Sequence, residues 1–434
     1  MSSVSAVLKP LFGTVAGLLG IYIGFISLLT IPKLQDHVIY LHKVTLTWFQ
    51  DVKIPEQWGF LRNQVTPFNL RTSDGETLHA WHVLLLDVYQ RHEAELIAEP
   101  TGLCQDVEKR LSFELLRDDP TAKLVIYFHG AAGTLSSGWR PQSYRAMSAA
   151  VSNLHVLAID YRGYGSSSGW PSESDRIVVF AQSLGTAVAL SLSQKLALEN
   201  SPTLFAGTVL VAPMADVETS TQTYKIAGTV PLLSPMALYP PLFTFLNKFI
   251  ISKWPSKAKI AEFIHHVDSV DINGRRNNYD ITLIHAEDDW DIPWIHSGML
   301  FEHAVRAMHD NASFTKDVFE EEKAKKKVQL GAGGWVVEWC GEHGVVREHI
   351  VKHGLHDRIM SYPVVSLAIA KAFTNTGMMD TILRIAASEI LVHMLKTKDC
   401  ITLKYNKNLP VKIAPWFIKF LKTFPANEGS EAGG

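Results

Sequence analysis

The stretch Ala181-Gln182-Ser183-Leu184-Gly185 decides the fold, because it joins a strand-like run to a helix-like run through a very tight turn. The apolar residues 177–180 precede it, and a helix-forming run, 186–190, follows it. A strand, a small-x-Ser-x-Gly turn and a helix form a nucleophile elbow, which holds a serine hydroxyl at a strand tip. Ala181 stands where glycine is usual, a departure that a methyl group permits. A serine at a strand–helix junction is often only an N-cap, so Ser183 needs chemical partners elsewhere.

The bulk composition fits a globular domain joined to a more apolar segment. The chain has 434 residues, enough for one large or two ordinary domains, and 47% of them are hydrophobic. A net charge of -2 argues against a nucleic-acid or polyanionic partner. The cysteines lie far apart without C-x-x-C spacing, which argues against a disulfide framework or a cysteine-based zinc site; they are Cys104, Cys340 and Cys400.

The N-terminal region has the pattern of a membrane anchor. No charged residue occurs from Leu11 to Ile31, a length that crosses a ~30 Å hydrocarbon core as a helix. A cleaved signal peptide is the alternative, but the apolar stretch is long for one and lacks a clear small-x-small cleavage site. We therefore expect residues 1–35 to be a retained single-pass anchor, with the endoplasmic reticulum as one candidate membrane. Lysines at both ends, Lys9 and Lys33, leave its orientation open.

The rest of the chain divides into a connector, one domain and a tail. Residues 36–60 are the connector, 61–373 the expected domain, and 374–434 a tail whose role stays open. Alternating runs on both sides of Asp74-Gly75 predict an antiparallel hairpin at the start of the domain. Short apolar runs typical of buried strands then alternate with helical patterns; they are 124–128, 156–160, 177–180, 208–211 and 281–285. This order predicts an α/β fold, a mainly parallel sheet led by the hairpin with helices on both faces.

Two segments interrupt that alternation of strands and helices. Residues 87–122 are rich in charged side chains, and we expect them to form an excursion over the surface. Residues 215–265 carry several prolines and many aromatic side chains, which favours a lid over ordinary core helices. An apolar lid of this kind would suit an apolar substrate.

Two loops downstream of Ser183 can supply the base and the acid that a serine nucleophile needs. In a fold with a nucleophile elbow, the acid and then the histidine follow the serine along the chain. Asp289 comes just after a strand-like run, where an Asp-x-x-Ile-Pro pattern begins, and Asp288 is the second choice. His356 lies in a loop after the expected strand 345–353 and close to a glycine, so it is the expected base.

Backbone donors for an oxyanion are expected from two places. One is the amide of Leu184, directly after the serine. The other is the amide of Ala131, in the loop 129–133 that follows the strand 124–128. Small residues in this loop let the backbone approach a substrate closely. We expect His129 to brace the loop and not to act as a second base, and this chemistry requires no metal or cofactor.

These motifs together resemble the α/β-hydrolase superfamily, and within it the α/β-hydrolase-domain protein 12 and 13 group. The segments that carry the resemblance are Tyr127-Phe128-His129-Gly130, Asp160-Tyr161-Arg162-Gly163-Tyr164-Gly165, Pro171-Ser172-Glu173, Gln182-Ser183-Leu184-Gly185-Thr186 and His285-Ala286-Glu287-Asp288-Asp289. They cover about residues 60–373 together with the anchor, and residues 354–363 resemble a fungal member. The resemblance implies a membrane-anchored serine lipase of the lysophospholipase or monoacylglycerol-lipase type. It places Ser183, Asp289 and His356 in the triad, and Ala131 and Leu184 at the oxyanion hole.

One departure from this family concerns the connection that precedes the elbow strand. Only residues 161–176 separate the strands that end at Asp160 and begin at Ile177, and Gly, Ser and Pro dominate there. Parallel strands need a crossover, and family members carry a helix of several turns at this place. We interpret the short connection as a missing segment that would uncover one sheet face, at roughly 25 cal/mol per Å² of exposed apolar area. Against a total stability of ~5–15 kcal/mol, that loss threatens folding as well as activity.

Three functions fit the sequence. The first is a membrane-anchored serine hydrolase that cleaves carboxylic esters of lipids, lysophospholipids or monoacylglycerols, through an acyl-enzyme. The second is a non-catalytic protein, either a pseudoenzyme or a truncated isoform, and the short connection motivates it. The third keeps the triad but acts on small esters or peptides. The expected partners are therefore a lipid ester and a membrane, and no nucleic acid.

Overall fold

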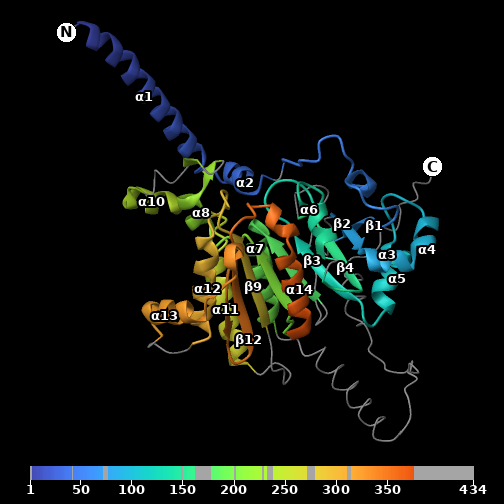
Figure 1. The fold of residues 1–434 in the computed structure, drawn as a ribbon. Helices are drawn as coiled ribbons and strands as arrows, with labels where there is room; N and C mark the ends of the chain where they lie inside the picture. The colour runs from blue at the N-terminus through green and yellow to red at the C-terminus, as the bar shows by residue number, and fades with distance from the viewer. Residues whose placement is uncertain are drawn as a thin grey trace, which may run out of the picture.

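The structure is a computed structural model, and it shows a long N-terminal helix that projects from a sheet flanked by helices (Figure 1). It describes residues 2–41, 43–71, 77–147, 150–161, 177–199, 202–226, 229–231, 238–270, 279–309 and 314–375. The expected tail, from residue 376 onward, lies outside these described residues, and so does most of the short connection, residues 162–176.

A ten-stranded sheet forms the core, in the order β1-β2-β4-β3-β5-β6-β9-β12-β11-β10. The hairpin β1 (Val65–Arg71) and β2 (Thr77–Leu84) is antiparallel, and β2 also runs antiparallel to β4 (Leu154–Ile159). The next neighbours are parallel to one another: β4, β3 (Lys123–Phe128), β5 (Ile177–Gln182), β6 (Gly207–Val211), β9 (Tyr279–Ala286) and β12 (Gly344–Val351). This arrangement confirms the predicted α/β fold with its leading hairpin.

The sheet continues beyond β12 with two strands that the sequence patterns did not indicate. They are β11 (Gly334–Cys340), antiparallel to β12, and the two-residue β10 (Val328–Gln329). A small separate ribbon is formed by β7 (Lys225–Ile226) and β8 (Val230–Pro231). The antiparallel extension lies at the opposite end of the sheet from the hairpin, so the parallel strands stay in the middle.

Helices pack on both faces of the sheet, because alternate side chains of each central strand point to opposite sides. Leu124 and Ile126 of β3 face a cluster shared with α7 (Leu184–Ala197), α11 (Ser256–Ser269) and α12 (Ile295–Ala307). Val125 and Tyr127 face a second cluster shared with α6 (Arg140–Ala146) and α14 (Pro363–Asn375). Every residue of β4, β5, β6 and β9 is buried, as expected for strands that are covered on both faces.

The charged stretch 87–122 is more than the predicted surface excursion. It forms α3 (Leu86–Arg91), α4 (Glu93–Ala98), η2 (Val107–Lys109) and α5 (Leu111–Asp118). Phe113 and Leu116 of α5 are buried in the same cluster as Leu124, so α5 covers part of the sheet. Its apolar positions are few, and the many charges around them hid the amphipathic pattern.

The predicted lid range, 215–265, extends too far. Its first part forms α8 (Val217–Thr223), the ribbon and α10 (Pro240–Asn247), but α11 begins at Ser256. Ile260 and Ile264 of α11 are fully buried in the core cluster that contains α7 and α12. The helical spacing of these apolar residues marks α11 as a core helix, and the candidate lid ends before it.

The N-terminal helix α1 (Ser2–Leu28) has the length and composition of a single-pass anchor. Its segment Pro10–Leu28 has 19 residues with a mean hydropathy of 2.0, and none of it is buried. α2 (Pro32–Tyr40) then returns the chain to the domain beside α8 and α10 (Figure 1). The remaining short elements are η1 (Pro55–Trp58), α13 (Lys316–Lys326), η4 (Gly331–Gly333) and η5 (Arg358–Ser361).

The strand order shows what the short connection must do. β4 and β5 lie on either side of β3 and are both parallel to it, so the chain between them crosses β3. The strand side chains Ile126, Leu157 and Val179, which face the α7 side, are buried. The crossover itself lies outside the described residues, so the missing helix stays a prediction.

Candidate active site

Ser183 occupies a strained turn between β5 and α7. Its backbone angles, φ 55° and ψ −126°, are unfavourable for any residue with a Cβ atom. A Cβ at Gly185 would lie 2.6 Å from the carbonyl oxygens of Phe128 and His129, so only glycine fits two residues after the serine. Ala181, two residues before it, is fully buried without such a conflict. This is the local geometry of a nucleophile elbow.

The structure brings the predicted acid and base together. Asp289 follows β9 and His356 follows the neighbouring parallel strand β12, so both leave the sheet at the same edge. His356 Nδ1 lies 2.8 Å from Asp289 Oδ2. The Asp289 side chain is fully buried and that of His356 is 13% exposed. An imidazole held in this way presents its other nitrogen for proton transfer.

The charges around His356 set its protonation. Burial alone lowers the pKa of His356, but the carboxylates of Asp289, Asp357 and Asp291 outweigh burial and raise it to about 9. Burial in turn would raise the pKa of Asp289, yet His356 and His285 hold it far below its usual range. The resting pair is therefore an imidazolium beside a carboxylate, and His356 must lose a proton before it can act as a base.

Asp288, the second choice for the acid, has a different task. Its Oδ1 accepts hydrogen bonds from the amides of Gly354 and Leu355, each at 2.8 Å. These bonds shape the loop that carries His356. The structure therefore separates the two neighbouring carboxylates, since Asp289 contacts the imidazole and Asp288 contacts the backbone.

Gln182, next to the serine, connects the elbow to the histidine loop. Its Nε2 donates to the carbonyl oxygen of His356 at 3.3 Å and to Asp357 Oδ1 at 3.2 Å. Within the part of the chain that is described, no hydrogen bond joins the Ser183 hydroxyl to His356. Such bonds often tighten only when substrate binds, and Gln182 holds the loop that carries His356 against the elbow.

The loop 129–133 lies directly against the elbow. A Cβ on Gly130 would lie 3.0 Å from Ser183 Cβ and would collide with the Gln182 side chain. Leu184 is the first residue of α7, so its amide has no acceptor within the helix. Among the described residues no acceptor is bonded to the amide of Ala131 either. Both predicted oxyanion donors thus have no acceptor among the described residues, and the loop that carries Ala131 contacts Ser183.

Arg140 holds this loop in place and was missed by sequence reasoning. Its guanidinium, on the first residue of α6, donates to the carbonyl oxygens of Thr134, Gly130, Ala131 and Ala132. The residue is only 7% exposed. These bonds fix the carbonyl groups of the loop. No residue pattern could have indicated this, because the partners are backbone groups.

His129 also contacts the loop that it begins. Its Nδ1 lies 2.7 Å from the Gly130 carbonyl oxygen, and Nε2 lies 3.3 Å from Asp160 Oδ1. The Tyr161 hydroxyl donates to the His129 carbonyl oxygen at 2.6 Å. His129 is fully buried, and that burial lowers its pKa. An imidazole whose two ring nitrogens face Gly130 and Asp160 is suited to bracing the loop.

His285 is a second residue that sequence reasoning did not assign. It lies at the end of β9 with no exposed surface, and its Nε2 is 3.1 Å from Asp289 Oδ2 and 2.8 Å from the Ile292 carbonyl oxygen. Its Nδ1 is 2.7 Å from Ser297 Oγ. Asp289 therefore lies between two imidazoles: it orients that of His356, and the imidazole of His285 holds Asp289 in place. The sequence signal for this residue is a histidine four residues before the predicted acid, in the segment 285–289.

The connector joins the anchor to the oxyanion loop. The Ala132 amide donates to the Tyr40 carbonyl oxygen at 3.0 Å, and Ser137 Oγ donates to that of Thr45 at 2.6 Å. Trp254 Nε1, at the end of the candidate lid, donates to the Tyr40 hydroxyl at 3.0 Å. The chain that leaves the anchor therefore contacts both the oxyanion loop and the lid.

The same residues could in principle gather a metal ion. Ligand atoms of Asp289, Asp291 and His356 lie within 4.8 Å of one another. A cation there would have to displace the 2.8 Å bond between His356 and Asp289. Only the imidazole and two carboxylates converge, and the closest contact among them is already a hydrogen bond. The arrangement is better suited to proton transfer.

Comparisons with known proteins agree with this geometry. No family model matches the chain. The lysophosphatidylserine lipase ABHD12 of Danio rerio is 25% identical over 311 residues, which cover 67% of this chain and 72% of that protein. The human protein ABHD12B is 24% identical over 307 residues, which cover 66% of this chain and 74% of that protein.

Among solved structures, the Pyrococcus furiosus esterase Pf2001 covers 74% of this chain and 95% of its own, with 13% identity and a TM-score of 0.38. A TM-score this low adds nothing to the assignment, which rests on the strand order, the elbow and the curated relatives. From these three observations the chain has an α/β-hydrolase fold and is similar to the ABHD12 group.

Proposed function

We propose that this chain is a membrane-anchored serine hydrolase that cleaves carboxylic esters of lipids. The observation that carries the proposal is the buried His356–Asp289 pair beside a serine in an elbow conformation. The amides of Leu184 and Ala131 would supply the oxyanion donors that acyl transfer needs. The apolar helix α1 would hold the enzyme at a membrane, such as that of the endoplasmic reticulum.

In this proposal Ser183 attacks the ester carbonyl and His356 accepts its proton. Asp289 orients the imidazole and stabilises its charged form, while the amides of Ala131 and Leu184 bind the oxyanion. His356 then protonates the departing alcohol, and an acyl-enzyme remains on Ser183. Water activated by His356 attacks the acyl-enzyme, which releases the fatty acid and restores the serine.

The substrate class comes from the relatives. Several curated relatives are named lysophosphatidylserine lipase, which indicates a lysophospholipid, and a monoacylglycerol shares the same single acyl ester. Apolar surface on the candidate lid supports a lipid over a small polar ester. We therefore place single-chain lipid esters first and small esters or peptides second.

A fluorescent fluorophosphonate tests the proposal on the full chain in detergent. It should label the parent protein, while the Ser183→Ala variant should show no labelling, because the reagent reacts with an activated serine. Ser193→Ala, a buried position on the same helix α7, is the matched control and should label like the parent. Equal labelling of Ser183→Ala would refute the assignment. An unlabelled but folded parent would favour the pseudoenzyme.

A further inference from the structure

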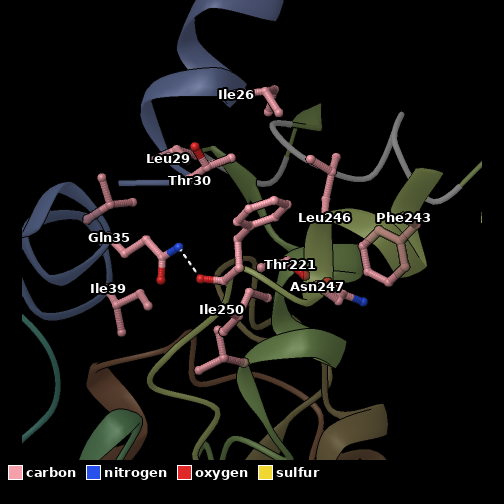
Figure 2. Close-up of a pocket in the computed structure, with 13 residues that line it drawn as sticks. Ile26, Leu29, Thr30, Gln35, Ile39, Thr221, Phe243, Leu246, Asn247 and Ile250 are labelled. Carbon is pink, nitrogen blue, oxygen red and sulfur yellow. Dashed lines mark hydrogen bonds between the residues drawn. The ribbon is translucent and has the colours of Figure 1, made fainter. Parts of the chain in front are cut away.

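An apolar cavity of about 130 Å³ lies where the anchor meets the candidate lid (Figure 2). One wall comes from the last turn of α1 and from α2, and the other comes from α8, α10 and the segment after α10. The residues that matter for its character are Ile26, Leu29, Ile39, Val217, Leu246 and Ile250. Among the described residues, no charged side chain lines the cavity.

The amide of Gln35, the polar group nearest the middle of this cavity, is already engaged. Its Nε2 donates to the carbonyl oxygen of Phe249 at 2.5 Å, and its Oε1 accepts from the amide of Ile251 at 3.2 Å. The dashed line in Figure 2 marks the first of these bonds. Gln35 therefore joins α2 to the lid backbone, and the polar lining that remains comes from Thr30, Thr221 and Asn247.

The inner wall of the cavity is continuous with the candidate active site. Ile39, Val217 and Ile250 line the cavity and also belong to one apolar cluster with Leu184. Ala131 packs against that cluster as well. One apolar cluster thus includes side chains of the cavity wall and of the two residues whose amides are the proposed oxyanion donors.

The outer side of the cavity is continuous with the anchor. Ile26 lies within the apolar span Pro10–Leu28. Next to it, α10 and the segment just after it expose large apolar side chains: Leu242 is 39% exposed, Phe245 54% and Phe249 38%. A bilayer around α1 would therefore also meet an apolar face of the lid, as in helices that lie at a membrane interface.

We propose that this cavity binds part of the acyl chain of a single-chain lipid ester, which enters from the bilayer along the end of α1. The proposal rests on the proposed function and adds to it the route and the chain-binding site. It makes the anchor part of the substrate site, since Ile26 and Leu29 form one wall. Each methylene group excluded from such a cavity should cost about fourfold in affinity.

The first experiment fills the cavity. Leu246→Trp should enlarge a lining side chain on α10, whereas Leu242→Trp adds the same ring on the same helix outside the cavity. We expect Leu246→Trp to lower the ratio of kcat/KM for oleoylglycerol to that for butanoylglycerol by about tenfold or more. Leu242→Trp should leave this ratio as in the parent. An equal ratio in all three proteins would overturn the proposal.

The second experiment needs no catalysis and covers a variant that does not fold. A monoacylglycerol with a diazirine in its acyl chain is photolysed with the Ser183→Ala protein in lipid nanodiscs. Cross-links should fall on peptides from residues 26–39 and 217–250, and excess oleoylglycerol should remove them. Cross-links elsewhere would overturn the cavity assignment. If the cross-links fall on these cavity peptides but the parent protein, with Ser183 intact, does not react with fluorophosphonate, the proposed acyl-chain site would stand. Only the proposed hydrolase activity would then be refuted.

Discussion

The two sides of the candidate site are built in different ways. On one side, His356 and Asp289 meet through their own side chains, and each follows its own strand closely. On the other side, backbone amides of the loop 129–133 are set by distant groups, the guanidinium of Arg140 and the carbonyl of Tyr40. A side-chain pair leaves a pattern in the sequence, whereas backbone donors held from afar leave almost none.

The largest expected effect is a difference in kcat between variants of the two neighbouring carboxylates, Asp289 and Asp288. Asp289→Asn should lower kcat by about 10³- to 10⁴-fold, because the amide stabilises the wrong tautomer of His356. Asp288→Asn should cost far less, since its Oδ1 can still accept from Gly354 and Leu355. Steady-state kinetics on both variants measures the difference. A larger loss in Asp288→Asn would exchange the two roles.

The next effect concerns the protonation of His356. Its pKa is raised to about 9, so below that pH the fraction of His356 in the neutral form rises about tenfold for each unit of pH increase. Fluorophosphonate labelling rates should therefore rise with pH well past the ordinary 6.5 of a histidine. Asp357→Asn removes one of the carboxylates that raise this pKa and should move the midpoint down. A midpoint at or below 6.5 in the parent would contradict the ion pair.

A third effect tests the second side of the site. Arg140→Lys keeps a positive charge, but an ammonium cannot reach the same fan of carbonyl groups as the guanidinium. We expect kcat to fall by about 10- to 100-fold with KM little changed. The displaced donors act on the charge that develops in the transition state and contribute little to binding of the substrate. Thermal unfolding of the same variant separates this loss from simple instability. Parallel losses in kcat and in the folded fraction would indicate a structural role alone.

The smallest effect concerns the connector. Ser137→Ala removes the hydrogen bond to the Thr45 carbonyl, a contact between the segment that follows the loop 129–133 and the chain that leaves the anchor, and it also removes the bond accepted from the Thr134 amide. A single bond of this kind contributes about 0.5–1.5 kcal/mol, so kcat/KM should fall roughly two- to tenfold. Ser136→Ala, whose Oγ contacts Thr134 within the loop, is the matched control. Identical effects of both variants would argue against a specific role for the connector.

Much of the fold could be read from the chain itself. Apolar runs marked β3, β4, β5, β6 and β9, and the Asp-Gly turn marked the hairpin, because burial and turn chemistry act over a few residues. The antiparallel β11 and the core helix α11 were not recognised, since charged or aromatic neighbours masked their periodicity. α5 was missed for the same reason, although Phe113 is only 3% exposed.

By itself, the sequence determined the tight turn at Ser183 and the apolar span of α1, and it predicted the order of the proposed acid and base. Each depends on residue types within one short segment: a glycine that alone fits the turn, a carboxylate after a strand, a run without charge. Only the tertiary structure decided that Arg140, His285 and the connector support the site, and that the lid meets the end of the anchor. Those contacts join surfaces far apart along the chain, where no local pattern records the partner.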